Sequence, residues 1–356
     1  MNSTFKTKNK LVGMNQPTYF IADIAANHDG NLNKAVELIH LCAENGADAA
    51  KFQNFSAETI VSDFGFNALG KQKSHQAGWK KSVSEVYEDA SIPLEWTKIL
   101  RDECDKANID YFTSPYDLNI LDYLSEYVCA WKIGSGDITW HEAISSMAKY
   151  DLPIFIASGA STLNEVKAAI KLIIKHNKNI CLMQCNTNYT ASNENFNYIE
   201  LNVLKTFKKE FTDIILGLSD HTAGHTTVLG AVALGAKVIE KHFTDSNDRE
   251  GPDHKFSMNP SSWREMILRT RELEKALGDQ DKVIMKNEKE TVVLQRRAIR
   301  AKKKIKKGYT IKKEDIVFLR PCPLDALPPY EYHLIINKTA NIDIEKEDII
   351  TVEKIR

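Results

Sequence analysis

Eight short apolar segments alternate along the chain with segments in which apolar residues recur every three or four positions. The first apolar segment ends near Ala26, and the others lie around Lys51, Phe112, Lys132, Ile156, Met183, Leu216 and Ile239. Apolar runs separated by helical patterns predict parallel strands with helices outside the sheet. An open doubly wound sheet uses the same units, but eight evenly spaced units favour closure into a (β/α)₈ TIM barrel.

The intervening segments carry the start and stop signals of helices. Residues 32–44 place apolar side chains on one stripe, and Gly46 follows as a stop signal. Thr162 and Glu165 have the spacing of a capping box, and an apolar helical pattern follows them. Pro260 is suited to the first turn of a helix that ends at Gly278. These signals support the division into strand and helix units.

The pattern changes near residue 288, where short apolar stretches alternate with basic turns. We therefore expect a barrel over residues 1–280, a charged linker over 281–289 and a small, mostly β domain over 290–356. The basic run 302–307 could indicate nucleic-acid binding. No aromatic residues interleave with this run, so a solvated strand and turn is the preferred interpretation.

Composition excludes some classes of partner. The formal net charge is −1, which gives no overall attraction to nucleic acid or to an anionic membrane. The six cysteines form no CxxC pair, which is typical of thiols in a reducing compartment. The N-terminus is polar, and no apolar run approaches the ~20 residues that cross a bilayer. We expect a cytoplasmic protein without a membrane partner.

Polar residues gather where the predicted strands end, which is where barrel enzymes place their reactive groups. These positions are Asp23, Lys51, Gln53, Ser114, Lys132, Ser135, Asp137, Asn186, Tyr189, Ser219, His221, Glu240 and His242. Burying such a ring costs desolvation energy unless the groups have partners or ligands. The two lysines could pair with neighbouring carboxylates. They could also bind phosphate and carboxylate oxygens, together with hydroxyls and backbone N–H groups at the strand ends.

The histidines of the last two strands form a second candidate site. His221 and His242 end adjacent strands, and two neighbouring imidazoles can share a divalent ion. Carboxylates and water would complete a shell suited to manganese. A purely structural role for each histidine is the alternative. Asp253, in the polar loop after the last strand, could orient substrate hydroxyls or simply form a turn.

Seven motifs in this order make the chain resemble a known family. They are NHDG at 27–30, KFQ at 51–53, KIGSGD at 132–137, GLSDHT at 217–222, ALGA at 233–236, EKHFT at 240–244 and GPDHKFSM at 251–258. Together they resemble the sialic acid (N-acetylneuraminate, nonulosonic acid) synthase family. The C-terminal segment resembles the antifreeze-like (SAF) domain that these synthases carry.

The resemblance implies a reaction. Phosphoenolpyruvate would condense with an N-acyl hexosamine aldehyde, either N-acetylmannosamine or a 2,4-diacetamido-6-deoxy relative, and phosphate would be released. A divalent metal would act as a Lewis acid, with Mn²⁺ expected and Mg²⁺ or Co²⁺ as alternatives. His221 and His242 match the metal ligands of the family.

The resemblance also assigns roles to the other residues. The positions that match phosphoenolpyruvate binding are Lys51, Lys132, Ser135 and Ser219, with Ser114 in place of a threonine and Asn186 or Thr187 in place of an asparagine. Gln53, Tyr189 and Asp253 match sugar-side positions. Arg320 matches an arginine that reaches the active site of the partner subunit, which implies a domain-swapped homodimer.

The chain departs from the family pattern at catalytic positions. Asp23 and Asp137 replace glutamates, which shortens each carboxylate by one methylene and changes the placement of a general acid or base. Two rival functions remain. One is a Schiff-base aldolase with Lys132 or Lys51 as nucleophile. The other is a non-catalytic carbohydrate-binding protein whose C-terminal domain is the binding module.

Overall fold

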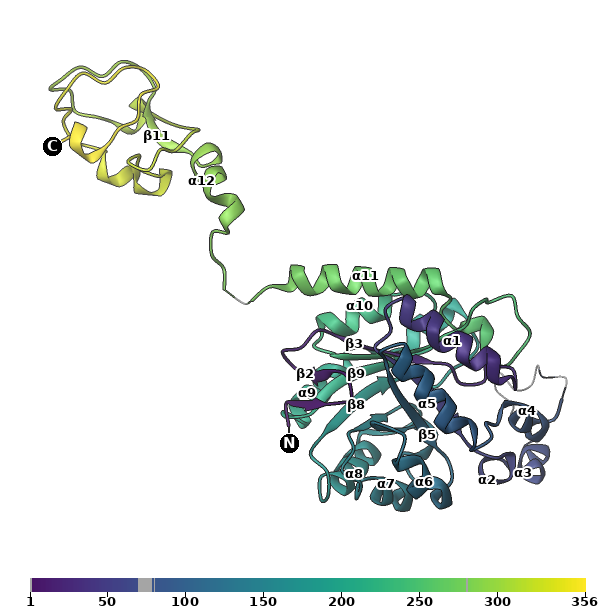
Figure 1. Ribbon diagram of the computed structural model, residues 1–356. Helices are drawn as coiled ribbons and strands as arrows, with labels where there is room; N and C mark the ends of the chain where they lie inside the picture. The colour runs from purple at the N-terminus through teal and green to yellow at the C-terminus, as the bar shows by residue number, and fades with distance from the viewer. Residues whose placement is uncertain (1, 70–78, 80, 280) are drawn as a thin grey trace. The chain divides into compact units, whose positions relative to one another are not determined.

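The computed structural model describes residues 2–69, 79, 81–279 and 281–356 (Figure 1). The chain divides into two compact units, Met1–Gly278 and Asp279–Arg356, each with its own hydrophobic core.

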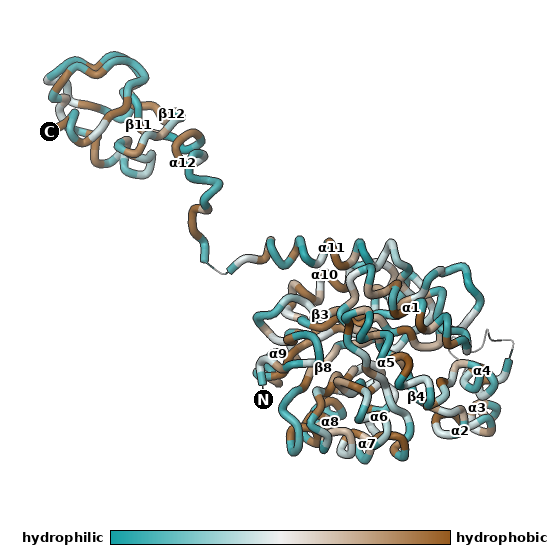
Figure 2. Tube along the Cα trace, in the orientation of Figure 1, coloured by the Kyte–Doolittle hydropathy of each residue, from teal (hydrophilic) through white to brown (hydrophobic). Residues whose placement is uncertain are grey.

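The first unit is a closed barrel of eight parallel strands in the order β10-β3-β4-β5-β6-β7-β8-β9. The strands are β3 (Tyr19–Asp23), β4 (Ala49–Asn54), β5 (Asp110–Pro115), β6 (Trp131–Ile133), β7 (Ile154–Ala157), β8 (Ile180–Cys185), β9 (Ile215–Asp220) and β10 (Val238–His242). All eight predicted strands are therefore confirmed. Figure 2 shows hydrophobic segments in the interior of this unit, around β3, and hydrophilic segments on outer helices such as α11.

Helices follow the strands and surround the barrel. They are α1 (Leu32–Glu44), α2 (Ala57–Ile60), α3 (Asp63–Ala68), α4 (Val83–Ala90), α5 (Trp96–Lys106), α6 (Leu121–Ser125), α7 (His141–Met147), α8 (Leu163–Ile173), α9 (Val203–Glu210), α10 (Thr226–Ala233) and α11 (Pro260–Leu277). The predicted capping box of Thr162 and Glu165 opens α8, and Gly278 ends α11 with a positive φ of 56°. Local end signals therefore set the bounds of these helices.

A hairpin at the N-terminus lies outside the eight predicted units. Strands β1 (Thr4–Lys6) and β2 (Leu11–Gly13) pair antiparallel. Phe5 packs edge-on against Phe155 of β7, with ring centroids 5.7 Å apart. Thr7 and Tyr19 both donate hydrogen bonds to Asp110 at the start of β5. The hairpin thus packs against the N-terminal end of the barrel.

The second unit is small and matches the expected β-rich domain. It contains α12 (Lys289–Gln295), β11 (Ala298–Ala301) and β12 (Ile316–Leu319), and β11 pairs antiparallel with β12. Its core is rich in isoleucine, including Ile299, Ile311 and Ile344. The charged stretch 281–289 contains a 3₁₀ turn, Lys286–Glu288, and runs into α12.

Two global features of the described residues bear on the sequence analysis. No helix among them is both long and apolar enough to span a bilayer. All six cysteines have free thiols, and four of them are buried.

Candidate active site

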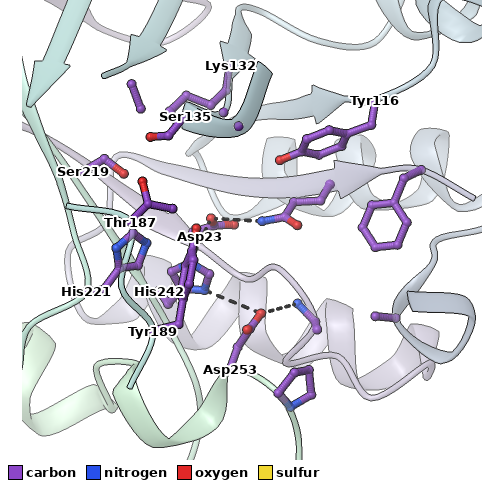
Figure 3. Close-up of a pocket in the computed structure, with 18 of the residues that line it drawn as sticks. Asp23, Tyr116, Lys132, Ser135, Thr187, Tyr189, Ser219, His221, His242 and Asp253 are labelled. Atoms are coloured by element: carbon purple, nitrogen blue, oxygen red, sulfur yellow. Dashed lines mark hydrogen bonds and ion pairs between the residues drawn. The ribbon is translucent and has the colours of Figure 1, made fainter. Parts of the chain in front are cut away.

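A cavity of about 440 Å³ opens at the C-terminal ends of the barrel strands. Most of the residues that the sequence singles out line it: Asp23, Lys51, Gln53, Lys132, Ser135, Asp137, Tyr189, Ser219, His221, His242 and Asp253. In Figure 3, Lys132 and Ser135 lie on one side, His221, His242 and Tyr189 on the other, and Asp23 between them. Residues from widely separated parts of the chain therefore meet in one site.

The alternation of side chains along the strands explains this convergence. Residues two apart on a strand point to the same side of the sheet. On β10, Glu240 and His242 both line the cavity, and Ser219 of β9 is the register partner of Glu240. Ser219 Oγ donates to Glu240 Oε1 at 3.1 Å inside the barrel.

Two lysines and two carboxylates form the floor of the cavity. Lys51 Nζ lies 2.6 Å from Asp23 Oδ2 and 3.5 Å from Glu240 Oε1. Lys132 Nζ lies 3.2 Å from the same Glu240 oxygen. Burial would raise the pKa of Glu240, but the charges of Lys132 and Lys51 lower it overall. Burial raises the pKa of Asp23 in spite of the opposing charge of Lys51, so Asp23 is the floor carboxyl group more ready to hold a proton.

Two imidazoles form the side wall. The ring centroids of His221 and His242 lie 5.3 Å apart, and Tyr189 packs 4.3 Å from His221. Nδ1 of His221 is 3.0 Å from the carbonyl oxygen of Asn186. These contacts fix both rings against the cavity.

His242 has the features of a metal ligand. Within the described part of the chain, its buried Nδ1 has no hydrogen-bond partner. The nearest acidic oxygens are Asp253 Oδ2, 3.7 Å from Nδ1, and Asp23 Oδ2, 3.5 Å from Nε2. Burial lowers the pKa of His242 to about 3, so the ring is neutral at pH 7 and keeps a lone pair available. An unpartnered, neutral imidazole is the state that binds a divalent cation.

His221 has a different environment. Burial would lower the pKa of His221, but hydrogen bonds with the Cys185 thiol and the Asn186 carbonyl raise it overall. Among the described residues, no group of three or more histidine, cysteine, aspartate or glutamate side chains is arranged around a common metal position. A cation bound here would have only the two imidazoles as protein ligands, and water and substrate would have to supply the others.

Small residues and hydroxyls make a third side of the cavity. The backbone N–H of Gly159 donates to Ser135 Oγ at 3.0 Å. A Cβ atom at Gly159 would lie 1.9 Å from Thr187 Oγ1 and 2.8 Å from Ser135 Oγ. Only glycine therefore fits there, and the hydroxyls of Ser135 and Thr187 converge on one small region, which suits anion oxygens.

Asp137 is a carboxyl group with a strongly altered acidity. It lies in the 3₁₀ turn after β6 and lines the cavity. Burial raises the pKa of Asp137 to about 6, with a smaller opposing effect from Lys132. A carboxyl group that titrates near neutral pH is suited to general acid–base chemistry.

An apolar wall faces the polar floor. Between β4 and β5 the chain makes an excursion that includes α2, α3 and α4, and Phe55, Trp79 and Tyr87 from it line the cavity. The ring of Phe55 lies 5.4 Å from Tyr87 and 6.0 Å from Tyr116. Tyr87 also lies 6.5 Å from Trp79. One side of the cavity therefore offers aromatic surface to a ligand.

Two residues of the first unit that were singled out in the sequence do not line this cavity. Ser114 is buried in β5. The side chain of Asn186 donates to the carbonyl of Tyr198 instead, because the chain turns after β8 and presents Thr187 to the cavity. Arg320 follows β12 in the second unit and is exposed there, and its role in the site of a partner subunit stays a prediction. Of the two alternatives for the anion site, Thr187 is the one that the structure places at the cavity.

Some of the lining residues had no role in the sequence analysis. Glu240 was named there only as a polar position at a strand end, and alternation puts it on the same face as His242, two positions later. Tyr116 lines the cavity from the position directly after β5, where strand alternation gives no prediction. The aromatic wall gave no comparable signal, because it depends on how a long excursion folds back over the barrel.

The chain was compared with protein families, curated proteins and solved structures. The NeuB family model matches residues 38–282, and the SAF domain model matches residues 296–356. The N,N'-diacetyllegionaminic acid synthase of Campylobacter jejuni is 33% identical, over 94% of this chain and 98% of that protein. The human N-acetylneuraminate-9-phosphate synthase is 30% identical, over 97% of this chain and 94% of that protein.

Solved structures give the same picture. The N-acetylneuraminic acid (sialic acid) synthetase of Leptospira borgpetersenii in complex with citrate superposes with a TM-score of 0.71 and 28% identity. That match covers 82% of this chain and 96% of the other. The spore coat polysaccharide biosynthesis protein SpsE of Bacillus subtilis superposes with a TM-score of 0.65 and 30% identity, over 99% of both chains.

Proposed function

Because the chain belongs to the NeuB family and carries a SAF domain, we propose that it is a nonulosonic acid synthase. The observation that carries this proposal is the convergence in one cavity of two buried lysines, Lys51 and Lys132, with two imidazoles, His221 and His242. Ammonium groups suit an anionic donor, and imidazoles suit a divalent cation.

The reaction proposed is the condensation of phosphoenolpyruvate with an N-acyl hexosamine aldehyde and water. Carbon 3 of phosphoenolpyruvate bonds to the aldehyde carbon, and the aldehyde oxygen takes a proton. Water adds at carbon 2, the carbon–oxygen bond to phosphate breaks, and a 2-keto sugar acid and inorganic phosphate leave. All atoms of the two substrates and of the water are accounted for in these products.

The phosphoenolpyruvate site would lie on the floor of the cavity. Lys51 and Lys132 supply the positive charge, and the hydroxyls of Ser135, Thr187 and Ser219 supply hydrogen bonds. Charge-assisted hydrogen bonds of this kind are roughly twice as strong as neutral ones. The carboxylates of Asp23 and Glu240 hold the lysines until the ligand arrives.

His221 and His242 would hold a divalent cation, for which Mn²⁺ is the proposed ion. When bound, such a cation supplies Lewis-acid stabilisation of the charge that develops on the aldehyde oxygen. The residues of this chain hold the imidazoles in place and keep His242 neutral. Asp137 and Asp23 are the carboxyl groups placed to move protons, because burial raises the pKa of each.

The acceptor would lie between the polar floor and the apolar wall. Gln53 and Asp253 offer hydrogen bonds to hydroxyl or amide groups, and Phe55 and Tyr87 offer aromatic surface. Such a wall favours methyl groups over a hydroxylated chain, because apolar surface gains free energy when it leaves water. We therefore expect a 2,4-diacetamido-6-deoxy hexose, with three methyl groups, to be a better acceptor than N-acetylmannosamine.

The deciding experiment is a panel of acceptors with phosphoenolpyruvate. Phosphate release and product mass would be followed with N-acetylmannosamine, its 2,4-diacetamido-6-deoxy relatives and a pentose phosphate, with and without Mn²⁺. Metal-dependent phosphate release together with a 2-keto acid product supports the synthase. Phosphate release with no acceptor at all, or none with any acceptor, contradicts it.

The same samples test the Schiff-base alternative. The pKa of Lys51 is raised, because the charges of Asp23 and Glu240 outweigh the effect of burial, and a protonated amine is a poor nucleophile. We therefore expect borohydride treatment with substrate to leave the mass of the protein unchanged. A stable adduct on Lys51 or Lys132 would favour the aldolase.

The role of Arg320 can be tested through subunit mixing. We propose that Arg320 completes the acceptor site of a partner subunit in a homodimer, because its planar fork can grip sugar or amide oxygens. Arg320→Ala and His221→Ala would each be inactive alone, and a refolded mixture would regain activity through the mixed dimer. A mixture that stays inactive contradicts the exchange of residues between subunits.

A further inference from the structure

A buried ion pair lies behind the two imidazoles, on the outer side of the barrel wall. Asp220 of β9 and Lys241 of β10 are register partners, and Lys241 Nζ lies 2.5 Å from Asp220 Oδ2. Each side chain is only 1% exposed. The cavity-lining pair Ser219 and Glu240 comes one residue earlier on the same strands, so alternation points the ion pair away from the cavity.

The ion pair is part of a hydrogen-bonded cluster that holds the chain around His221. Lys241 Nζ also donates to the carbonyl of Thr222 at 2.6 Å. The hydroxyls of Thr222 and Thr227 donate to Asp220 Oδ2 at 2.8 and 2.7 Å. Lys241 therefore binds the residues on both sides of His221, and its own backbone leads directly into His242. The cluster links the C-terminal ends of β9 and β10 to the first turn of α10, next to His221 and His242.

An ion pair is an unusual choice at this position on grounds of stability alone. The preceding outward positions, Leu218 and Ile239, are apolar and fully buried. Replacing a buried ion pair by packed apolar side chains is often neutral or stabilising, since the desolvation cost disappears. The hydrogen bonds of the ion pair fix the backbone on each side of His221, and apolar packing at this position would not do so.

We propose that Asp220 and Lys241 are positioning residues that set the spacing and direction of His221 and His242 for a divalent cation. This inference rests on the proposed function, since it assumes that the two imidazoles bind the cation. Neither residue touches substrate, and both act through the backbone of the ligands. Outer residues that orient metal ligands typically contribute 10–100-fold to metal affinity.

Binding of Mn²⁺ to the full-length protein tests the proposal without any turnover. Free Mn²⁺ would be measured by electron paramagnetic resonance for the wild type, Asp220→Asn, Lys241→Met and the double variant. We expect each single variant to raise the Kd for Mn²⁺ by about 10–100-fold. Each also loses thermal stability, because one charge stays buried without its partner.

The double variant separates positioning from stability. It removes both charges, so we expect the Tm to recover towards the wild-type value while the Kd for Mn²⁺ stays high. Recovery of Mn²⁺ affinity together with the Tm would show a purely structural pair and overturn the proposal. Thr227→Val is a milder variant that keeps the shape of the side chain, and we expect it to weaken Mn²⁺ binding by a smaller factor than Asp220→Asn.

Asp110→Asn is the matched control. Asp110 is also a buried carboxylate that accepts bonds from two hydroxyls, but it starts β5, at the opposite end of the barrel strands. The Asp110→Asn variant should be less stable than the wild type but should bind Mn²⁺ with the same affinity. If the wild type releases phosphate with Mn²⁺ and the Asp220 and Lys241 variants bind Mn²⁺ as tightly as the wild type, the positioning role is rejected and the proposed function stands. A wild type that neither binds Mn²⁺ nor releases phosphate would reject the proposed function.

Discussion

The two ends of the barrel both bury carboxylates, but they satisfy them differently. At the N-terminal end, Asp110 accepts hydrogen bonds from Thr7, Tyr19 and the backbone of Asn9, so both of its oxygens have partners. At the C-terminal end, Glu240 Oε2 and His242 Nδ1 are buried without a partner among the described residues. Buried polar groups are normally hydrogen-bonded, and leaving one unpaired is costly. Asp110 is a satisfied carboxylate that serves stability, whereas the unmet polar atoms of Glu240 and His242 are suited to receive a ligand.

The largest effect should come from the unmet imidazole. His242→Ala removes a cation ligand, and we expect kcat to fall by about 10²–10³-fold, the size associated with loss of a main electrostatic stabiliser. The Tm should stay close to that of the wild type, because Nδ1 makes no hydrogen bond in the structure. Phosphate-release kinetics and thermal unfolding measure the two quantities. Full activity in this variant would remove the main contrast between the two ends.

The next effect should appear in substrate binding. Lys132→Met removes one of the two ammonium groups on the cavity floor, and we expect the KM for phosphoenolpyruvate to rise by about 10–100-fold, the value of a charged hydrogen bond. The KM for the acceptor should change much less, because Lys132 lies on the floor and away from the aromatic wall. Steady-state kinetics with each substrate varied in turn would show the difference. An equal rise in both KM values would contradict a dedicated anion site.

A smaller effect should appear in the pH profile. The pKa of Asp137 is raised to about 6 by burial, so its carboxylate form is lost as the pH falls below that value. If Asp137 acts as a base, kcat at pH 5 should be about tenfold below its plateau, in proportion to the ionised fraction. A series of rates from pH 5 to 8 measures this limb, and Asp137→Asn should abolish it. A limb that persists in Asp137→Asn must belong to another group.

No effect on activity is expected from a change at Asp110, at the N-terminal end of the barrel. Asp110→Asn breaks the buried network of Thr7 and Tyr19, and we expect a loss of about 1–3 kcal/mol in the free energy of unfolding. The kcat should be unchanged, since Asp110 lies outside the cavity lining. Urea denaturation and turnover assays on the same sample give both values. A fall in kcat comparable to that of His242→Ala would show that the two ends are coupled.

The comparison also shows what the sequence could and could not predict. The eight strands and the helix boundaries at Thr162, Pro260 and Gly278 depend on local patterns, so they were predictable. The convergence of Lys51, Lys132 and the two histidines followed from the rule that strand ends share one rim. Those predictions needed only the order of the units and their alternation.

The missing parts depend on contacts between distant segments. The β1–β2 hairpin consists of two three-residue strands, which are too short to give a periodic signal. Its position depends on Phe5 packing against Phe155, a contact across 150 positions of the chain. The aromatic wall likewise depends on how α4 folds back to place Tyr87 beside Phe55. The choice between Asn186 and Thr187 depended on one turn after β8, which no spacing rule describes.

The carboxylate of Glu240, shared by Lys51 and Lys132, gives the cavity its own counter-ion. Lys51 and Lys132 both lie within 3.5 Å of its Oε1, so one of their two positive charges is already balanced before any ligand enters. An arriving anion therefore has to displace the Glu240 carboxylate from the two lysines before it can bind to them. Chloride carries a single charge and gains too little from that exchange, whereas a molecule with both a phosphate and a carboxylate group can engage both lysines at once. We therefore expect an anion that carries two charged groups to bind to the lysines much more tightly than chloride does.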